Sequence, residues 1–167
     1  MNKFSVIIPC YNESKNIFKL VKELKDNLSQ EIYEIVIIDD KSNDESFEVY
    51  KRLEMNNIKI YYNEKNMGQS FSLYKGIQLA KYDTIITIDG DGQNDPKDLN
   101  KIINKYLNTI NIKLISGVRK NRKDSFSKII ASNFDILRTI VHEKIFLNRF
   151  RWSKYLYITI LTYHRPK

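Results

Sequence analysis

The stretch that decides the fold is residues 4–28, "FSVIIPCYNESKNIFKLVKELKDNL". It opens with a short apolar run rich in β-branched residues, "FSVIIP" (4–9), which predicts a buried strand. From residue 17 onward, apolar residues recur at the three- and four-residue spacing of an amphipathic helix, and Ser14 is the predicted N-cap. The stretch therefore predicts one strand followed directly by one helix.

The same strand-and-helix unit repeats along the next 90 or so residues. The further predicted pairs are "EIVIID" (34–39) with 44–56, "IKIYY" (58–62) with 68–80, and "TIITID" (84–89) with 96–107, where Pro96 suits a first helical turn. "KLISG" (113–117) supplies a fifth strand. Strands that are apolar on both faces and separated by amphipathic helices form a parallel sheet covered on both sides. We therefore expect a doubly wound α/β fold with a mostly parallel sheet, over residues 1–124.

Length and composition limit the class of protein. A chain of 167 residues with 42% hydrophobic content can form one domain with a real core. Cys10 is the only cysteine, which rules out an intramolecular disulfide framework and a paired-cysteine metal site. No secretory leader opens the chain, and the apolar run "YLYITILTY" (155–163) is far shorter than the roughly 20 residues that span a bilayer. The expectation is a soluble cytoplasmic protein.

The net charge of +8 is concentrated at one end of the chain. Residues 112–167 contain 13 of the 28 Lys and Arg residues but only 3 of the 20 Asp and Glu residues. A basic end of this kind is more typical of a solvated or membrane-facing surface than of a nucleic-acid site. We expect no nucleic-acid partner.

Polar segments follow each predicted strand. These are "PCYNES", "DDKSND", "NEKNMG", "DGDGQND" and "GVRKNRKD". In doubly wound sheets, ligands bind outside the carboxyl ends of the strands, so the five loops are predicted to surround one site. None matches the glycine-rich dinucleotide or Walker patterns.

The fourth of these loops has the features of a metal site. Asp89 and Asp91 follow a strand one residue apart, and the glycines beside them free the backbone. Carboxylate oxygens suit Mg²⁺ or Mn²⁺ rather than zinc, and Gln93 offers a neutral oxygen. Because Mg²⁺ commonly completes its shell with substrate phosphates, the pattern indicates a nucleoside diphosphate whose attached group is transferred.

Four of these segments together resemble the family 2 glycosyltransferases with the GT-A fold. The matching segments are "SVIIPCYNE", "IVIIDDKSND", "NEKNMGQSFSLYKGI" and "DGDGQNDP", and the resemblance covers about residues 3–124. The last, with Gln two residues after the second Asp, is similar to the branch that moves a sugar onto a polyprenyl phosphate, of which dolichol-phosphate mannosyltransferase is the type. The resemblance implies an inverting, metal-dependent hexosyltransferase that takes a UDP- or GDP-linked sugar as donor.

The resemblance also implies roles for individual residues. Pro9, Tyr11, Glu13 and Gly68 would line the donor pocket, and Asp40 would accept a hydrogen bond from the base.

At the diphosphate, the resemblance places Asp89 on the ribose or the metal, and Asp91 on the metal with help from Gln93. Arg119, joined by Arg122 or Lys123, would contact phosphate oxygens, and Asp91 and Arg119 would be the catalytic pair. A forked guanidinium suits phosphate, and a phosphate acceptor needs no general base to become a nucleophile.

Several of these residues have a structural interpretation as well. Asp39 and Asp40 suit the N-terminal dipole of the following helix, and Asp44 suits an N-cap. Tyr11 and Glu13 fit a plain turn. Arg119 and its basic neighbours fit a solvated face.

Residues 125–167 depart from the family pattern. Their first part has some helical spacing, and the remainder shows no pattern that we assign. One interpretation is a basic, aromatic segment that rests on anionic lipid headgroups at the cytoplasmic face of a membrane. Another is a truncated acceptor side, which would leave a non-catalytic remnant that binds nucleotide sugars. A nucleotidyltransferase is less favoured, because no glycine-rich basic loop follows the first strand.

Overall fold

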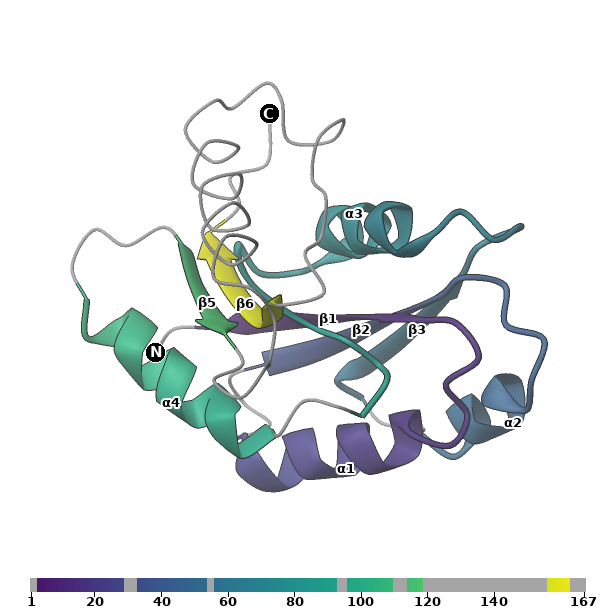
Figure 1. The fold of residues 1–167 in the computed structure, drawn as a ribbon, viewed down its shortest axis with the longest axis horizontal. Coiled ribbons are helices and arrows are strands. Elements are labelled where there is room, and N and C mark those ends of the chain that lie inside the picture. Colours follow the sequence, from purple (N-terminus) through teal and green to yellow (C-terminus); the bar gives the residue numbers. More distant parts are fainter. Residues whose placement is uncertain are drawn as a thin grey trace, which may run out of the picture.

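The computed structural model describes residues 3–28, 33–53, 56–92, 96–109, 114–118 and 156–162. These residues form a six-stranded sheet with helices on both faces (Figure 1). The strands are β1 Phe4–Cys10, β2 Tyr33–Asp39, β3 Ile58–Tyr62, β4 Thr84–Ile88, β5 Leu114–Val118 and β6 Leu156–Thr162. The helices are α1 Ile17–Asn27, α2 Ser46–Lys51, α3 Gln69–Leu79 and α4 Pro96–Leu107. The doubly wound α/β prediction is confirmed.

The sheet has the strand order β3-β2-β1-β4-β6-β5. The first four strands are parallel, with Phe4 opposite Tyr33 on one side of β1 and opposite Thr84 on the other. The chain thus builds outward from β1 to β3 and then returns past β1 to lay down β4. Ligand sites of doubly wound sheets lie where the strand order reverses in this way, at the carboxyl ends of the strands.

The sixth strand comes from the part of the chain in which the sequence predicted no strand. β6 pairs antiparallel with β4 on one side and with β5 on the other. The predicted fifth strand therefore exists but does not contact β4 directly. Since both partners run antiparallel to β6, β5 points the same way as β1 to β4, and its carboxyl end lies at the same edge of the sheet.

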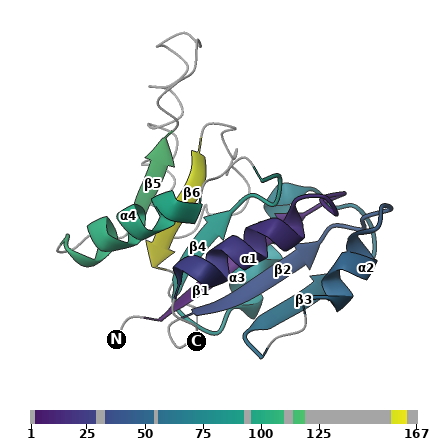
Figure 2. The same cartoon turned by 90° about the horizontal axis from the view of Figure 1, so that it is seen from below.

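Two apolar clusters fix the layers. One joins alternate residues of the central strands, such as Val6 and Ile8, to α1, α2 and α4. The other joins the intervening residues, such as Ile7, to α3. This division follows from the pleat, which sends successive side chains to opposite faces of a strand. Figure 2 shows α1, α2 and α4 on the near face of the sheet, with α3 behind it.

The helix boundaries correct two sequence predictions. The prediction of Ser14 as the first N-cap is wrong, because α1 begins at Ile17 after the N-cap Asn16. The second helix is only six residues long, Ser46–Lys51, rather than 44–56. The longest helix in the described part of the chain has 12 residues, and none there has the length and apolarity needed to span a bilayer.

The amino end of the sheet is held by a buried acid. Glu34 is 4% exposed; its Oε1 accepts hydrogen bonds from the Ser5 hydroxyl and the Lys81 N–H, and its Oε2 lies 3.1 Å from the Lys59 ammonium. Hydrogen bonding and attraction to this carboxylate raise the pKa of Lys59. Because these contacts lie at the edge opposite the carboxyl ends of the strands, we regard Glu34 as a structural residue.

Candidate active site at the carboxyl edge of the sheet

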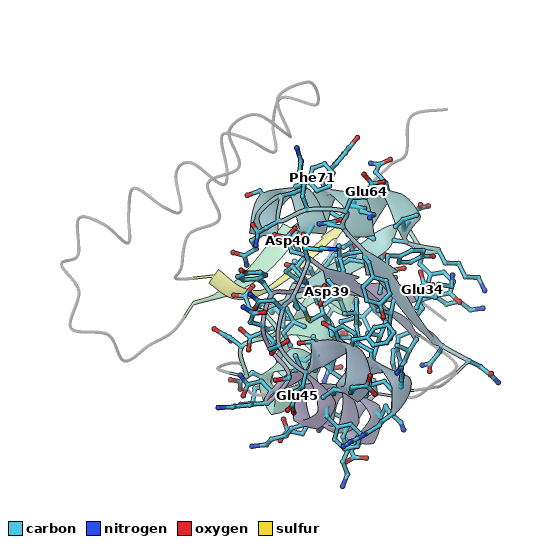
Figure 3. The ribbon with its side chains drawn as sticks, turned by 90° about the vertical axis from the view of Figure 1, so that its right-hand side faces the viewer. Glu34, Asp39, Asp40, Glu45, Glu64 and Phe71 are labelled. Atoms are coloured by element: carbon cyan, nitrogen blue, oxygen red, sulfur yellow. The ribbon has the colours of Figure 1, made fainter. Side chains whose placement is uncertain are left out.

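The loops after the four parallel strands meet at one edge of the molecule. Figure 3 views the protein from this edge, with Asp39 and Asp40 near the centre. Phe71 of α3 and Glu64 of the loop before it lie above them, and Glu45 at the start of α2 lies below.

The loops after β1 and β2 are tied together by side chains. The Asn12 N–H donates to the Ser42 hydroxyl at 2.9 Å, and the Asn12 side-chain oxygen accepts from the Asn43 N–H at 2.9 Å. Asn12 has a φ of 58°, in the left-handed region that Asn tolerates better than most residues. The two loops therefore form one rigid unit beside the end of β1.

Asp44 adds a further tie between these loops. Its Oδ2 accepts from the Ser14 N–H and its Oδ1 from the Ser46 N–H, both at 3.0 Å. Burial opposes ionisation, but the hydrogen bonds from Ser46 and Ser14 lower the pKa of Asp44 to about 2. The N-cap of α2 is Glu45, so the prediction of Asp44 as the N-cap is off by one residue, although Asp44 does bind the first N–H of the helix.

Asp39 has a structural role that differs from the predicted one. Its Oδ1 accepts from the Ser42 N–H at 2.9 Å and its Oδ2 from the Tyr50 hydroxyl at 2.8 Å. Burial raises the pKa of Tyr50, so this hydroxyl stays a neutral donor. Specific hydrogen bonds to a loop and a side chain, more than a helix dipole, therefore account for Asp39.

Asp40 points the other way, toward the loop between β3 and α3. It is 3% exposed, and its Oδ1 accepts from the Asn63 side-chain amide at 2.7 Å and the Met67 N–H at 2.8 Å. Its Oδ2 accepts from the Gly68 N–H at 2.7 Å. A carboxylate offers about four lone-pair positions, and these three donors occupy three of them.

Asn63 is in turn held by α3. Its amide nitrogen also donates to the Ser72 hydroxyl at 2.9 Å, and its oxygen accepts from the Lys75 ammonium at 3.0 Å. Lys75 donates to the Tyr62 carbonyl as well, at 2.7 Å. Asp40 is thus oriented by a network that extends to Lys75, more than one helical turn into α3.

Asp89 and Asp91 leave β4 at the same edge. Both side chains are half-buried, and Asp89 Oδ1 accepts a 2.7 Å hydrogen bond from the side-chain amide of Gln69, the first residue of α3. This contact joins the acidic turn to the loop that Asp40 holds.

Two glycines let the acidic turn approach the loop after β1. A Cβ added to Gly90 would lie 3.0 Å from Cys10 Sγ and 3.2 Å from the Pro9 carbonyl oxygen, with Glu13 Cγ at 3.6 Å. Gly92 has a φ of 70°, and a Cβ there would lie 3.2 Å from the Asn16 side-chain oxygen. The acidic turn thus lies directly against the end of β1 and the start of α1.

The donor atoms at this turn fit a hard divalent cation. The Asp89 and Asp91 carboxylates supply the oxygens that Mg²⁺ and Mn²⁺ prefer. Burial raises the pKa of the neighbouring Cys10 thiol, which is therefore neutral and is no soft thiolate ligand. Among the described residues there is no group of three or more acidic, His or Cys side chains that could hold a metal by itself.

Four of the remaining predicted site residues are described by the structure. Pro9 is buried in β1, Glu13 is half-buried and accepts from the Asn16 amide at 2.8 Å, and Tyr11 is 48% exposed. Gly68 supplies an N–H to Asp40 and has a φ of 87°. Gln93, Arg119 and Arg122 lie outside the described residues.

The sequence analysis did not identify three functional candidates, Asn16, Asn63 and Gln69. Each is an amide beside a loop or at a helix start, and each contacts a residue from a different part of the site or its supporting loops. The nearest sequence signal is the polar, glycine-containing segment 63–69, but nothing in it says which amide faces which acid.

The family model for glycosyl transferase family 2 matches residues 5–164. The chain belongs to glycosyl transferase family 2. The match runs well past residue 124, where the sequence resemblance was expected to end, and it includes β6.

Individual relatives agree with this assignment. The chain is 32% identical over 134 residues to an undecaprenyl-phosphate 4-deoxy-4-formamido-L-arabinose transferase of Aeromonas hydrophila, which covers 77% of this chain and 40% of that relative. Among solved structures, glucosyl-3-phosphoglycerate synthase of Mycobacterium tuberculosis in complex with UDP has a TM-score of 0.66 and 15% identity, over 96% of this chain and 57% of that one. A mannosyltransferase of Pyrobaculum calidifontis in complex with GDP-Man and Mn²⁺ has a TM-score of 0.62 and 19% identity, over 71% of this chain and 36% of that one. These two structures share the fold.

The family 2 chain is short beside its relatives. It spans between 40% and 64% of the length of three curated relatives that it matches.

Proposed function

We propose that this family 2 chain transfers a sugar from a nucleoside-diphosphate sugar to a polyprenyl phosphate. The observation that carries the proposal is the acidic turn Asp89 to Asp91, which lies against the end of β1 through Gly90 and against α3 through Gln69. Carboxylates held at the reversal point of the sheet suit a metal-bound diphosphate. The names of curated relatives that act on undecaprenyl phosphate support the choice of acceptor.

In this proposal the nucleoside lies along the loops after β1, β2 and β3. Pro9, Tyr11 and Glu13 line its pocket, and the exposed ring of Tyr11 offers a stacking surface for the base. Asp40 accepts one N–H of the base with its remaining lone pair, next to Gly68.

The diphosphate lies at the acidic turn. Asp89 contacts the ribose or the metal, and Asp91 holds Mg²⁺ or Mn²⁺ together with Gln93. When bound, such an ion neutralises the charge that develops on the departing diphosphate. Solved neighbours whose structures contain Mn²⁺ support the use of a divalent metal.

The acceptor reacts without a general base. An oxygen of its phosphate, already ionised at neutral pH, forms a bond to the anomeric carbon of the sugar. The bond from that carbon to the diphosphate breaks, and the nucleoside diphosphate leaves with the electron pair. A single displacement of this kind inverts the anomeric centre. We assign Arg119 and Arg122 to the phosphate oxygens of donor and acceptor, because an arginine fork matches phosphate and offsets the repulsion between two anions.

Contact with a membrane is the last part of the proposal. The acceptor is a lipid, and residues 112–167 hold 13 of the 28 basic residues of the chain. Basic side chains in this part of the chain would draw the protein to anionic headgroups at the inner face of the cytoplasmic membrane.

The test is a transfer assay. UDP- and GDP-sugars labelled in the sugar are incubated with the protein, Mn²⁺ and a polyprenyl phosphate in detergent, and label is measured in the organic phase. The expected result is transfer from one donor class that falls roughly 100-fold or more in Asp91→Asn, because the metal contributes several kcal/mol. Asp83→Asn is the matched control, since Asp83 is an exposed acid at the opposite end of β4.

Two outcomes would contradict the proposal. Equal transfer by Asp91→Asn and wild type would show that the acidic turn takes no part in the reaction. Donor binding without transfer to any acceptor would instead identify a chain that binds nucleotide sugars and does not catalyse.

A further inference from the structure

Gln69 occupies a position that neither the family assignment nor the sequence predictions explain. It is the first residue of α3, and its side-chain amide donates to Asp89 Oδ1 at 2.7 Å across 20 residues of sequence. The contact is side chain to side chain, so the identity of residue 69 decides whether it forms.

The backbone before Gln69 is fixed by Asp40. The N–H groups of Met67 and Gly68 both donate to the Asp40 carboxylate, at 2.8 and 2.7 Å. Gly68 has a φ of 87°, and a Cβ on it would meet nothing within 4 Å, so glycine is needed there for its backbone angle and not for space. Asp40 therefore sets where α3 begins and where the side chain of Gln69 starts.

A neutral amide is well suited to this position. It orients a carboxylate through one N–H while leaving the negative charge of that carboxylate intact, whereas a lysine or arginine would neutralise it. Groups that hydrogen-bond to metal-binding carboxylates fix their orientation and raise metal affinity.

We propose that Gln69 is a positioning residue that orients Asp89 toward the metal site. It thereby couples that site to Asp40 at the end of β2. This inference rests on the proposed function, because that function gives Asp89 its part in the donor site. It adds Gln69 of α3 to the residues that build the metal site. It also predicts that a change of the side chain at residue 69 alters metal binding without altering the fold.

The test compares Gln69→Met with wild type. Met has nearly the length and helix propensity of Gln but carries no N–H donor, so the helix is preserved and the hydrogen bond is lost. Gln78→Met makes the same change near the other end of α3 and serves as the matched control. The probe is Mn²⁺ alone, followed as broadening of the backbone amide NMR signals of Gly90 and Gly92, and thermal melting of each variant reports its fold.

The expected result is broadening in wild type that requires roughly 10-fold more Mn²⁺ in Gln69→Met, at an unchanged melting temperature. Gln78→Met should require the same Mn²⁺ concentration as wild type. Equal Mn²⁺ dependence in wild type and Gln69→Met would overturn the inference, as would an absence of broadening in wild type.

A parallel titration with UDP and GDP separates this inference from the proposed function. If wild type shows the Mn²⁺ response and its dependence on Gln69 but binds neither nucleotide, the positioning role stands and the proposed function fails. If a nucleotide binds in an Mn²⁺-dependent way and Gln69→Met binds it equally well, the proposed function stands and the role of Gln69 fails.

Discussion

Asp39 and Asp40 are adjacent in the sequence and serve opposite sides of the sheet. Asp39 binds Ser42 and Tyr50 on the side of α2, whereas Asp40 binds the loop that leads into α3. The alternation of a strand dictates this split. Sequence reasoning could predict that the two acids differ, but not their partners, since all of these except Ser42 lie more than ten residues away.

The acid Asp44 gives a prediction about pH. Its pKa is about 2 in the folded protein and close to 3.9 in an unfolded chain, so its contribution to stability is present above about pH 4 and is lost as the pH falls toward 2. Asp44 is exposed, so we expect the contribution to be below about 1 kcal/mol.

The measurement is urea unfolding of wild type and Asp44→Asn at pH 6, 4, 3 and 2. The free energy of unfolding of wild type should fall more steeply between pH 4 and 2 than that of the variant, because Asn has no proton to gain. Parallel curves would show that the contacts of Asp44 with Ser14 and Ser46 do not depend on its charge.

At the scale of single elements, the close packing of α3 against the sheet depends on Gly76. A Cβ added to Gly76 would overlap Cγ2 of Ile7 and lie 3.2 Å from Cγ1 of Ile38, both buried in the sheet. The helix therefore packs closer to β1 and β2 than any larger residue allows. This packing matters for function, because α3 also carries residues that orient the acids of the site. Gln69 donates to Asp89, and Ser72 and Lys75 hold Asn63, which donates to Asp40.

Gly76→Ala should destabilise the protein by about 1 to 3 kcal/mol, since overpacking a rigid core outweighs a gain in helix propensity of about 1 kcal/mol or less. Ile7→Ala removes the methyl group that the new Cβ would strike. In chemical denaturation, the double variant Gly76→Ala/Ile7→Ala should lose at least about 0.5 kcal/mol less stability than the two single changes together. Additive losses would mean that α3 moves away from the sheet instead of straining against Ile7.

Helix positions were easier to predict than helix starts. Apolar spacing located α1 and α4 well, and Pro96 does begin α4. Ser14 is not the N-cap of α1, and its N–H instead donates to Asp44 in another loop, a contact that nothing near Ser14 in the sequence reveals.

At the scale of the whole molecule, the parallel half of the sheet could be predicted, whereas in the antiparallel half β5 was predicted as a strand but β6 and its pairing were not. Each of the first four strands has a recognisable apolar run in the sequence and is followed by a predicted helix. β6 lies between β4 and β5 although it follows them in sequence, and such distant pairing leaves no local mark. The composition of Leu156–Thr162, in which four of seven residues are β-branched, was the available signal for a strand.

The site residues divide in the same way, into those with a local sequence signal and those without one. Asp89 and Asp91 stand out because acids at the end of a buried strand are costly without a partner. Asn63 and Gln69 became visible only when the loops were brought together, because an amide in a loop has no distinctive pattern. Arg119, Arg122 and Gln93 lie outside the described residues, so their roles stay predictions.

The measurement that tests the central claim most directly is isothermal titration of the protein with UDP and GDP, each with and without Mn²⁺. We expect one of the two nucleotides to bind only when Mn²⁺ is present, with binding lost in Asp91→Asn and retained in Asp83→Asn. Nucleotide binding that ignores Mn²⁺ and survives Asp91→Asn, or no binding of either nucleotide, would contradict a metal-dependent donor site at the carboxyl edge of this sheet.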